Sequence, residues 1–277
     1  MPRINPLPSG SVLYSLEGPD DQGRIAAKAQ NFVVEWIDSV ARPLAAESGD
    51  ELLLILPRGA AEVGIGERSY AFEGPAAAIA PPGKIDLTLT CGGPLILVAT
   101  DRPDLRQASA GFNPENDPRI APIGHAFERQ QPLADLLVAP FDSIANPAGN
   151  PRIRFLQTAT MSVNIVRYDG PRDSTSLSPH AHTDLQQGTL ALAGRYVHHL
   201  RTPWGKDVAN WREDEHIEAG PGTLLLIPPE VIHTTQGIGE EPHLLIDIFA
   251  PPRRDFIAKG WVANSSEYRD LEDQSGR

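Results

Sequence analysis

Short apolar segments separated by glycine and proline turns run along the whole chain. Examples are ELLLIL at residues 51–56, AAAIA at 76–80, GTLALA at 188–193 and TLLLI at 223–227. Apolar runs of this length, bounded by turn residues, are typical of buried β-strands. The 24 glycines and 27 prolines are spread in small clusters such as EGP, APPGK and GPG, which supply the turns. The pattern predicts an all-β protein.

Helical periodicity is rare. The best helix candidate is PLADLLVAP at residues 132–140, while GRIAAKAQNFV at 23–33 fits either a strand or a helix.

Two segments share one skeleton: an apolar strand, a glycine turn, a second apolar strand and a proline corner. The first combines ELLLILPRG with EGPAAAIAPPGKIDLTLT, and the second combines GTLALAG with GPGTLLLIPPEVIHTT. This spacing indicates a duplicated unit with a turn-rich connector between the copies. We therefore expect a degenerate N-terminal domain at 11–105, a connector at 106–150, a metal-binding C-terminal domain at 151–260 and a tail at 261–277.

The composition limits the classes of partner and the cellular location that we expect. A net charge of -12 over 277 residues leaves no basic patch for phosphates, so nucleic acid and anionic membranes are poor partners. No apolar run approaches the roughly 18 residues of a membrane span. The single cysteine excludes an intrachain disulfide, and MPRINPLPSG lacks the features of a secretory signal. We expect a cytoplasmic protein whose partner is a small molecule.

The histidines place the chemistry in the second half, because only His125 of the eight precedes residue 170. The first half is then expected to be structural or dimerising. A metal site made of carboxylates there, with Glu47 or Glu51, is the open alternative.

One pair of histidines and a glutamine stand close together in SPHAHTDLQQGTLALAG. On a strand, His180 and His182 project to the same side, because successive side chains alternate. Gln187 lies an odd step beyond, so TDLQ must turn the chain before Gln187 begins a returning strand and again points inward. A third imidazole, His233, follows GPGTLLLIPP, whose prolines bend the chain. Three imidazoles and one amide oxygen suit Zn²⁺, Ni²⁺, Fe²⁺ or Mn²⁺ and are poor for Ca²⁺ or Mg²⁺. Gln187 has a second interpretation, as a group that hydrogen-bonds a ligand histidine.

These two stretches, PHAHTDLQQGTLALAG and GPGTLLLIPPEVIH, resemble the two motifs of the cupin superfamily, and the whole chain resembles a bicupin. The resemblance implies two cupin barrels, or double-stranded β-helices, in tandem. Gln187 stands where cupins usually have glutamate, Glu230 where they have glycine and Gln236 where they have asparagine.

The neutral amide leaves a bound divalent ion with more of its charge than a carboxylate would. This favours Lewis-acid chemistry over redox cycling, and Zn²⁺ or Ni²⁺ over Fe²⁺ or Mn²⁺. Asp247 lies within the apolar strand HLLIDIFA, where a carboxylate is costly to bury without a partner. We interpret Asp247 as a general base with a raised pKa. The alternative is a structural salt bridge to Arg253 or Arg254.

The segment DIFAPPRRDF, together with the histidines and Gln187, resembles small cupins that open unsaturated uronates to linear keto acids. The likeness covers residues 158–256. It implies that Asp247 is the acid/base group and that Arg253 binds the substrate carboxylate, with His180, His182, Gln187 and His233 holding the metal.

The stretch GRYVHHLRTPWGKDVANWREDEHIEAG is longer than the link between the two motifs of a simple cupin. One of His198 and His199 should face the cavity, since neighbours on a strand alternate. Tyr196, Arg201 and Trp204 are candidates for the cavity mouth, where aromatic rings stack on a sugar and arginine pairs with an anion. The alternative is a hairpin tip or a dimer contact.

Together these features predict a metal-dependent enzyme that acts on a small oxygenated, anionic, sugar-acid-like substrate by ring opening, isomerisation or elimination. One alternative is an Fe²⁺-dependent dioxygenase of an aromatic or diketone substrate, and the other is a non-enzymatic barrel that binds a small molecule. We expect a homodimer, because exposed strands commonly pair and most oligomers are symmetric.

Overall fold

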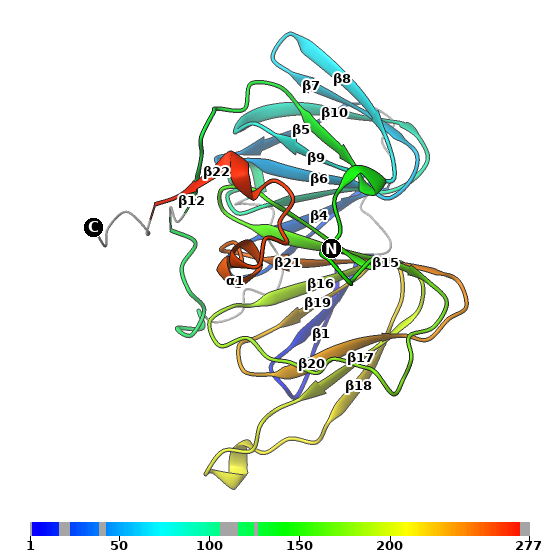
Figure 1. Ribbon diagram of the computed structural model, residues 1–277, viewed down its shortest axis with the longest axis vertical. Helices are drawn as coiled ribbons and strands as arrows, with labels where there is room; N and C mark the ends of the chain where they lie inside the picture. The colour runs from blue at the N-terminus through cyan, green and yellow to red at the C-terminus, as the bar shows by residue number, and fades with distance from the viewer. Residues whose placement is uncertain (1, 17–22, 39–42, 106–115, 125–126, 272–277) are drawn as a thin grey trace.

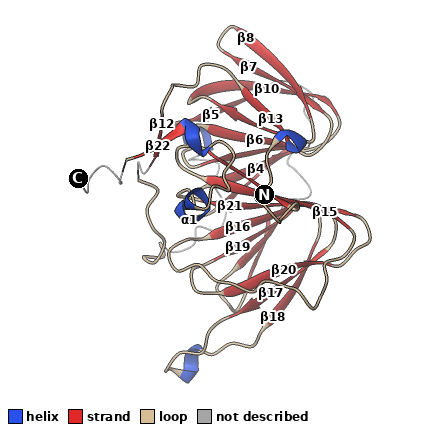
Figure 2. Ribbon diagram, in the orientation of Figure 1, coloured by secondary structure: helices blue, strands red, loops and turns tan. Residues whose placement is uncertain are grey.

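A computed structural model describes residues 2–16, 23–38, 43–105, 116–124 and 127–271. Strands dominate it, which confirms the predicted all-β class (Figure 2). In these residues the one α-helix is α1 (Arg254–Ala258), and 3-10 turns occur at Pro103–Leu105, Phe141–Ser143, Val208–Asn210 and Ser265–Glu267. No helix in the described ranges has the length and hydropathy needed to cross a membrane.

The first barrel is built from two antiparallel sheets. The larger has the order β13 (Leu137–Pro140), β9 (Ala76–Ala80), β6 (Leu52–Leu56), β11 (Leu95–Ala99), β4 (Val33–Ile37) and β3 (Arg24–Lys28). The smaller has the order β5 (Leu44–Ser48), β10 (Gly83–Cys91), β7 (Ala60–Ile65) and β8 (Arg68–Glu73).

The second barrel repeats the arrangement. Its large sheet has the order β1 (Arg3–Pro6), β2 (Val12–Ser15), β19 (Thr223–Ile227), β16 (Gln187–Ala193), β21 (Pro242–Phe249), β15 (Ser162–Asp169) and β14 (Ile153–Gln157). Its small sheet has the order β18 (Glu215–Ala219), β17 (Tyr196–Arg201) and β20 (Ile232–Gly237). A separate ribbon joins β12 (Phe127–Arg129) to β22 (Tyr268–Asp270).

Two strands lie in sheets outside the segments expected to form those barrels. β2 pairs with β19 of the second barrel, and β13 pairs with β9 of the first. The pairing therefore crosses the expected limits of 11–105 and 106–150. Residues 261–271, expected to be a tail, contain β22 and lie against the connector.

The helix predicted at residues 132–140 is wrong, because Leu137–Pro140 forms an edge strand on β9. Its terminal Pro140 lacks an N–H, which is tolerated at the edge of a sheet. Residues 24–28, for which the sequence left two options, form a strand.

The two large sheets pack against each other in the middle of the molecule, with the small sheets outside them (Figure 1). In β6, Leu53 and Ile55 face this shared core, while Leu52, Leu54 and Leu56 fill the interior of the first barrel. Burial on both faces explains why these strands read as unbroken apolar runs. Among the described residues, the interior of the second barrel holds two small apolar clusters, around Tyr196 and Leu200, and polar groups occupy other parts of it.

Candidate metal centre and cavity

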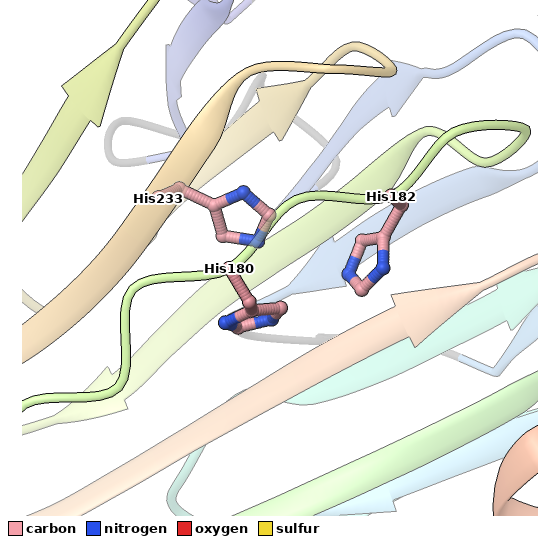
Figure 3. A group of neighbouring side chains, drawn as sticks. All are labelled: His180, His182 and His233. Carbon is pink, nitrogen blue, oxygen red and sulfur yellow. The ribbon is translucent and has the colours of Figure 1, made fainter.

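Three imidazoles converge inside the second barrel. His180 and His182 lie in the segment before β16, and His233 lies on β20 (Figure 3). One nitrogen from each ring lies within 4.8 Å of the others. This arrangement agrees with the sequence prediction of a three-histidine cluster.

The backbone holds the cluster with less regular structure than expected. The strand expected at residues 180–182 is reduced to a single bridge, in which the His233 N–H donates to the His180 carbonyl at 2.8 Å and the reverse bond measures 3.1 Å. The Glu230 N–H donates to the His182 carbonyl at 2.6 Å. Glu230 has a positive φ of 70° at this corner, where the cupin pattern has glycine.

Backbone carbonyls fix the orientation of two of the rings. His180 Nδ1 lies 2.9 Å from the Ser178 carbonyl, and His233 Nδ1 lies 2.9 Å from the Val231 carbonyl. A carbonyl only accepts, so each Nδ1 carries the proton and each Nε2 presents its lone pair. Burial lowers the pKa of His233 to about 3, and burial followed by Arg253 lowers that of His182 to about 4. Both rings are therefore neutral at pH 7, as metal ligands must be.

Gln187 opens β16 after a turn, as the sequence predicts, and its amide oxygen points at the histidines. The oxygen lies 2.9 Å from Nε2 of His182 and 3.1 Å from Nε2 of His233. The amide nitrogen donates to Thr189 Oγ1 at 2.9 Å and to Asp247 Oδ1 at 3.1 Å. These two acceptors fix the amide orientation, so the oxygen stands where a fourth ligand would. The donor set fits a divalent transition ion held by the three histidines and Gln187.

Asp247 lies behind Gln187 and takes its hydrogen bonds from neutral groups. Thr189 Oγ1 donates to Oδ1 at 2.9 Å, and Asn164 Nδ2 donates to Oδ2 at 3.1 Å. Burial raises the pKa of Asp247 to about 6, against the smaller lowering effect of these donors. The alternative salt bridges are not formed in the described chain, because Arg253 pairs with Asp255 and Arg254 with Asp270.

A cavity of about 290 Å³ opens beside this cluster. His180, His233, Gln187, Asp247 and Tyr196 form part of its wall. The wall also includes Asn150, Arg152, Asn164, Tyr168, Arg172 and Trp261. The site therefore joins the metal-binding donors to a space large enough for a small metabolite.

The residues predicted to bind substrate are scattered. Tyr196 is buried, and its hydroxyl donates to the Ala193 carbonyl at 2.7 Å. Strand alternation holds in β17: His198 is buried with Nδ1 2.9 Å from Thr235 Oγ1, whereas His199 Nδ1 contacts His216 on the other face. Neither histidine is part of the cavity wall in the described chain.

Arg201 is the last residue of β17, and Trp204 lies in the connection between β17 and β18. This hairpin extends away from the barrels (Figure 1). Arg201 pairs with Asp214, and Trp204 stacks on Trp211 with 69% of its surface exposed. This geometry matches the alternative of a hairpin tip.

Arg253 lies next to the cluster rather than in the cavity wall. Its Nη1 is 3.2 Å and 3.4 Å from the two ring nitrogens of His182, and its guanidinium stacks 4.1 Å from the centre of the Phe256 ring. Two hydrogen bonds to Asp255, of 2.7 and 2.8 Å, balance its charge.

Several polar residues of the wall were not identified from the sequence, among them Asn164, Arg152 and Arg172. Asn164 carries a signal, since it interrupts the apolar strand SVNIV. Arg152 and Arg172 flank strands in polar stretches, where nothing in the sequence marks them as facing a cavity.

Glu51 of the first barrel, the alternative metal ligand there, serves another purpose. It accepts hydrogen bonds from the Ala159 N–H at 2.9 Å and the Tyr268 hydroxyl at 3.0 Å, and it pairs with Arg129. These contacts tie the first barrel to the connector and the C-terminal ribbon.

No protein-family model and no curated protein matches the chain. Solved structures do match it. Protein Ylba from E. coli aligns with a TM-score of 0.55 at 12% identity, covering 90% of this chain and 93% of that one. Oxalate decarboxylase from Lactobacillus farciminis, in a formate complex, aligns at 0.52 and 14% identity, covering 100% and 87%. The Bacillus subtilis oxalate decarboxylase, described with Mn(II) centres, aligns at 0.52 and 10% identity, covering 99% and 78%.

These likenesses concern the fold alone. They confirm the predicted fold of two cupin barrels in tandem over nearly the whole chain. The finer likeness of the second barrel to uronate-opening cupins stays a prediction.

Proposed function

We propose that this protein is a metal-dependent enzyme acting on a small, oxygenated, anionic substrate of sugar-acid type, by ring opening, isomerisation or elimination. The observation that carries the proposal is a cluster beside one cavity. The imidazoles of His180, His182 and His233 converge with the oxygen of Gln187, and Asp247 hydrogen-bonds the Gln187 amide and lines the cavity.

A divalent ion bound by these neutral ligands would polarise a substrate oxygen as a Lewis acid. Zn²⁺ and Ni²⁺ suit this chemistry best, and the same donors accept Fe²⁺ and Mn²⁺.

Asp247 is the group that moves the proton. Its Oδ1 already accepts from Thr189 and Gln187, whereas Oδ2 accepts from Asn164 alone among the described residues. Since Asp247 is part of the cavity wall, Oδ2 is the oxygen with an acceptor position left for a substrate proton. With a pKa of about 6, the carboxylate is ionised at neutral pH and remains able to return the proton.

The test follows loss of the 4,5-unsaturated uronate absorbance with protein loaded in turn with Zn²⁺, Ni²⁺, Mn²⁺ or Fe²⁺. Asp247→Asn should lower turnover by about 100-fold or more, the usual worth of a general base, without changing the metal content. The substitution suits the site, because Asn164 Oδ1 has no hydrogen-bond partner among the described residues. In the variant, a flip of the Asn164 amide would offer that oxygen to the N–H of the introduced amide. The control is Asp214→Asn, on the exposed hairpin, which should leave turnover unchanged.

Inactivity toward uronates with every ion would contradict the substrate class. Oxygen uptake that requires Fe²⁺ would instead favour the dioxygenase, and binding of sugar acids without turnover would favour a binding protein.

A further inference from the structure

Two arginines in the cavity wall have no acidic partner in the described part of the chain. Their neighbours Arg154 and Arg167 both pair with Asp142, at 3.9 and 2.9 Å. Among the described residues, Arg152 and Arg172 form no ion pair. Arg172 donates to two backbone carbonyls, at 3.3 and 3.1 Å, and the Arg152 guanidinium lies 5.9 Å from the centre of the Tyr168 ring.

The positive charge of this pair is uncompensated. Burial, and then the like charge of Arg152, lower the pKa of Arg172. Keeping two cations together in a partly buried wall costs free energy unless an anion joins them. Arg253 differs, because Asp255 neutralises it and aromatic rings cover it.

The same wall offers a hydrogen-bond acceptor with no protein partner. Asn164 Oδ1 is buried and unpaired, and its orientation is fixed because Nδ2 donates to Asp247. A buried acceptor of this kind needs a donor, which ordered water or a bound molecule supplies. A hydroxyl group meets that need.

We propose that Arg152 and Arg172 form an anion subsite for the substrate carboxylate, with Asn164 Oδ1 accepting from a substrate hydroxyl. The substrate is then a small hydroxy acid whose carboxylate binds the arginine pair while its remaining oxygens face the histidines. This inference rests on the proposed function, and it moves the carboxylate from Arg253, as the sequence implied, to the arginine pair. Guanidinium groups suit the role, since they bind carboxylates through paired hydrogen bonds.

The test measures binding of D-galacturonate by calorimetry to full-length protein kept metal-free with a chelator, with neutral D-galactose as the comparison. Arg152→Met and Arg172→Met should each weaken galacturonate binding at least about tenfold, the usual effect of losing a charge-assisted hydrogen bond. Arg172→Lys, which keeps the charge, should retain more of the affinity than Arg172→Met. The matched control is Arg167→Met, because Arg167 is an exposed residue of β15 that is not among the residues lining the cavity; this variant should bind like the parent protein.

Equal affinity in the parent and both methionine variants, or absence of saturable galacturonate binding to the parent, would overturn the subsite. So would a loss confined to Arg253→Met, which would restore the assignment from the sequence. If Arg172→Met does not fold, Arg152→Met decides the result. The binding experiment does not depend on turnover, so a failure of the proposed chemistry would not change its result. In the same way, a failure of the subsite would not change the result of the turnover assay with metal.

Discussion

Replacing Gln187 by glutamate restores the usual cupin ligand but places two carboxylates side by side. In the native protein the Gln187 amide nitrogen lies 3.1 Å from Asp247 Oδ1. A glutamate oxygen at that position would repel Asp247 by about 5 kcal/mol at an effective dielectric constant of about 20. The protein can avoid this by protonating one of the two carboxylates.

The free-energy cost of that protonation sets the expected loss of stability at pH 8. The pKa of Asp247 is about 6, so holding its proton at pH 8 costs about 3 kcal/mol, at about 1.4 kcal/mol per pH unit. The folded variant then retains a proton that its unfolded chain has lost. Its free energy of unfolding should therefore fall as pH rises from 6 to 8, while at pH 6 the variant and the parent should differ little.

Urea unfolding of metal-free protein at pH 6 and pH 8 measures this effect. The double variant Gln187→Glu, Asp247→Asn removes one charge and should regain the lost stability at pH 8. If Gln187→Glu were as stable as the parent at pH 8, or if Asp247→Asn failed to rescue it, the contact between Gln187 and Asp247 would not be as described.

Further predictions concern stability. His198 is fully buried and its pKa is lowered to about 4 by burial, so the unfolded chain takes up the proton first as pH falls. The unfolding free energy of the parent protein should therefore decrease between pH 6.5 and pH 5. In His198→Gln this decrease should be smaller by about 2 kcal/mol, measured on metal-free protein. An unchanged dependence of the unfolding free energy on pH would contradict this. Glu51→Ala should lower the melting temperature, with a loss of about 2 kcal/mol or more, because it removes one of the two carboxylate partners of Arg129 and the acceptor of the Ala159 N–H and the Tyr268 hydroxyl; an unshifted melting curve would refute that tie. Gly194→Ala should also destabilise the protein, since φ is +89° and the new Cβ would lie 2.5 Å from the His243 ring; a neutral result in thermal unfolding would show that this corner relaxes.

The parts of the structure that follow from local spacing could be predicted from the sequence. His180 and His182 belong to one motif and His233 to the other. Each motif has its own turn, and these turns bring the histidine-bearing segments side by side, with the imidazoles on the same side. The turn before Gln187 was predictable for the same reason, since the step to His182 is odd.

Contacts made between distant segments could not be predicted in this way. VLYS at residues 12–15 reads as a strand but carries no signal of which sheet it joins. Leu137–Pro140 imitates a helix pattern, and only its pairing with β9 makes it a strand. Arg172 lies in a polar loop, so its place in the cavity depends on how that loop returns over β20.

The arginine pair moves the expected site of substrate recognition from the hairpin to the cavity wall. The residues predicted around Trp204 lie on an exposed hairpin, while the uncompensated charge lies with Arg152 and Arg172. Substrate recognition is then expected inside the barrel rather than at its rim.

The most direct test of the central claim is an anomalous difference map from a crystal of the protein loaded with Zn²⁺ and recorded at the zinc edge. The account predicts one strong peak among Nε2 of His180, His182 and His233 and Oε1 of Gln187. A map in which the peak lies elsewhere, or in which these four atoms surround no anomalous signal, would contradict it.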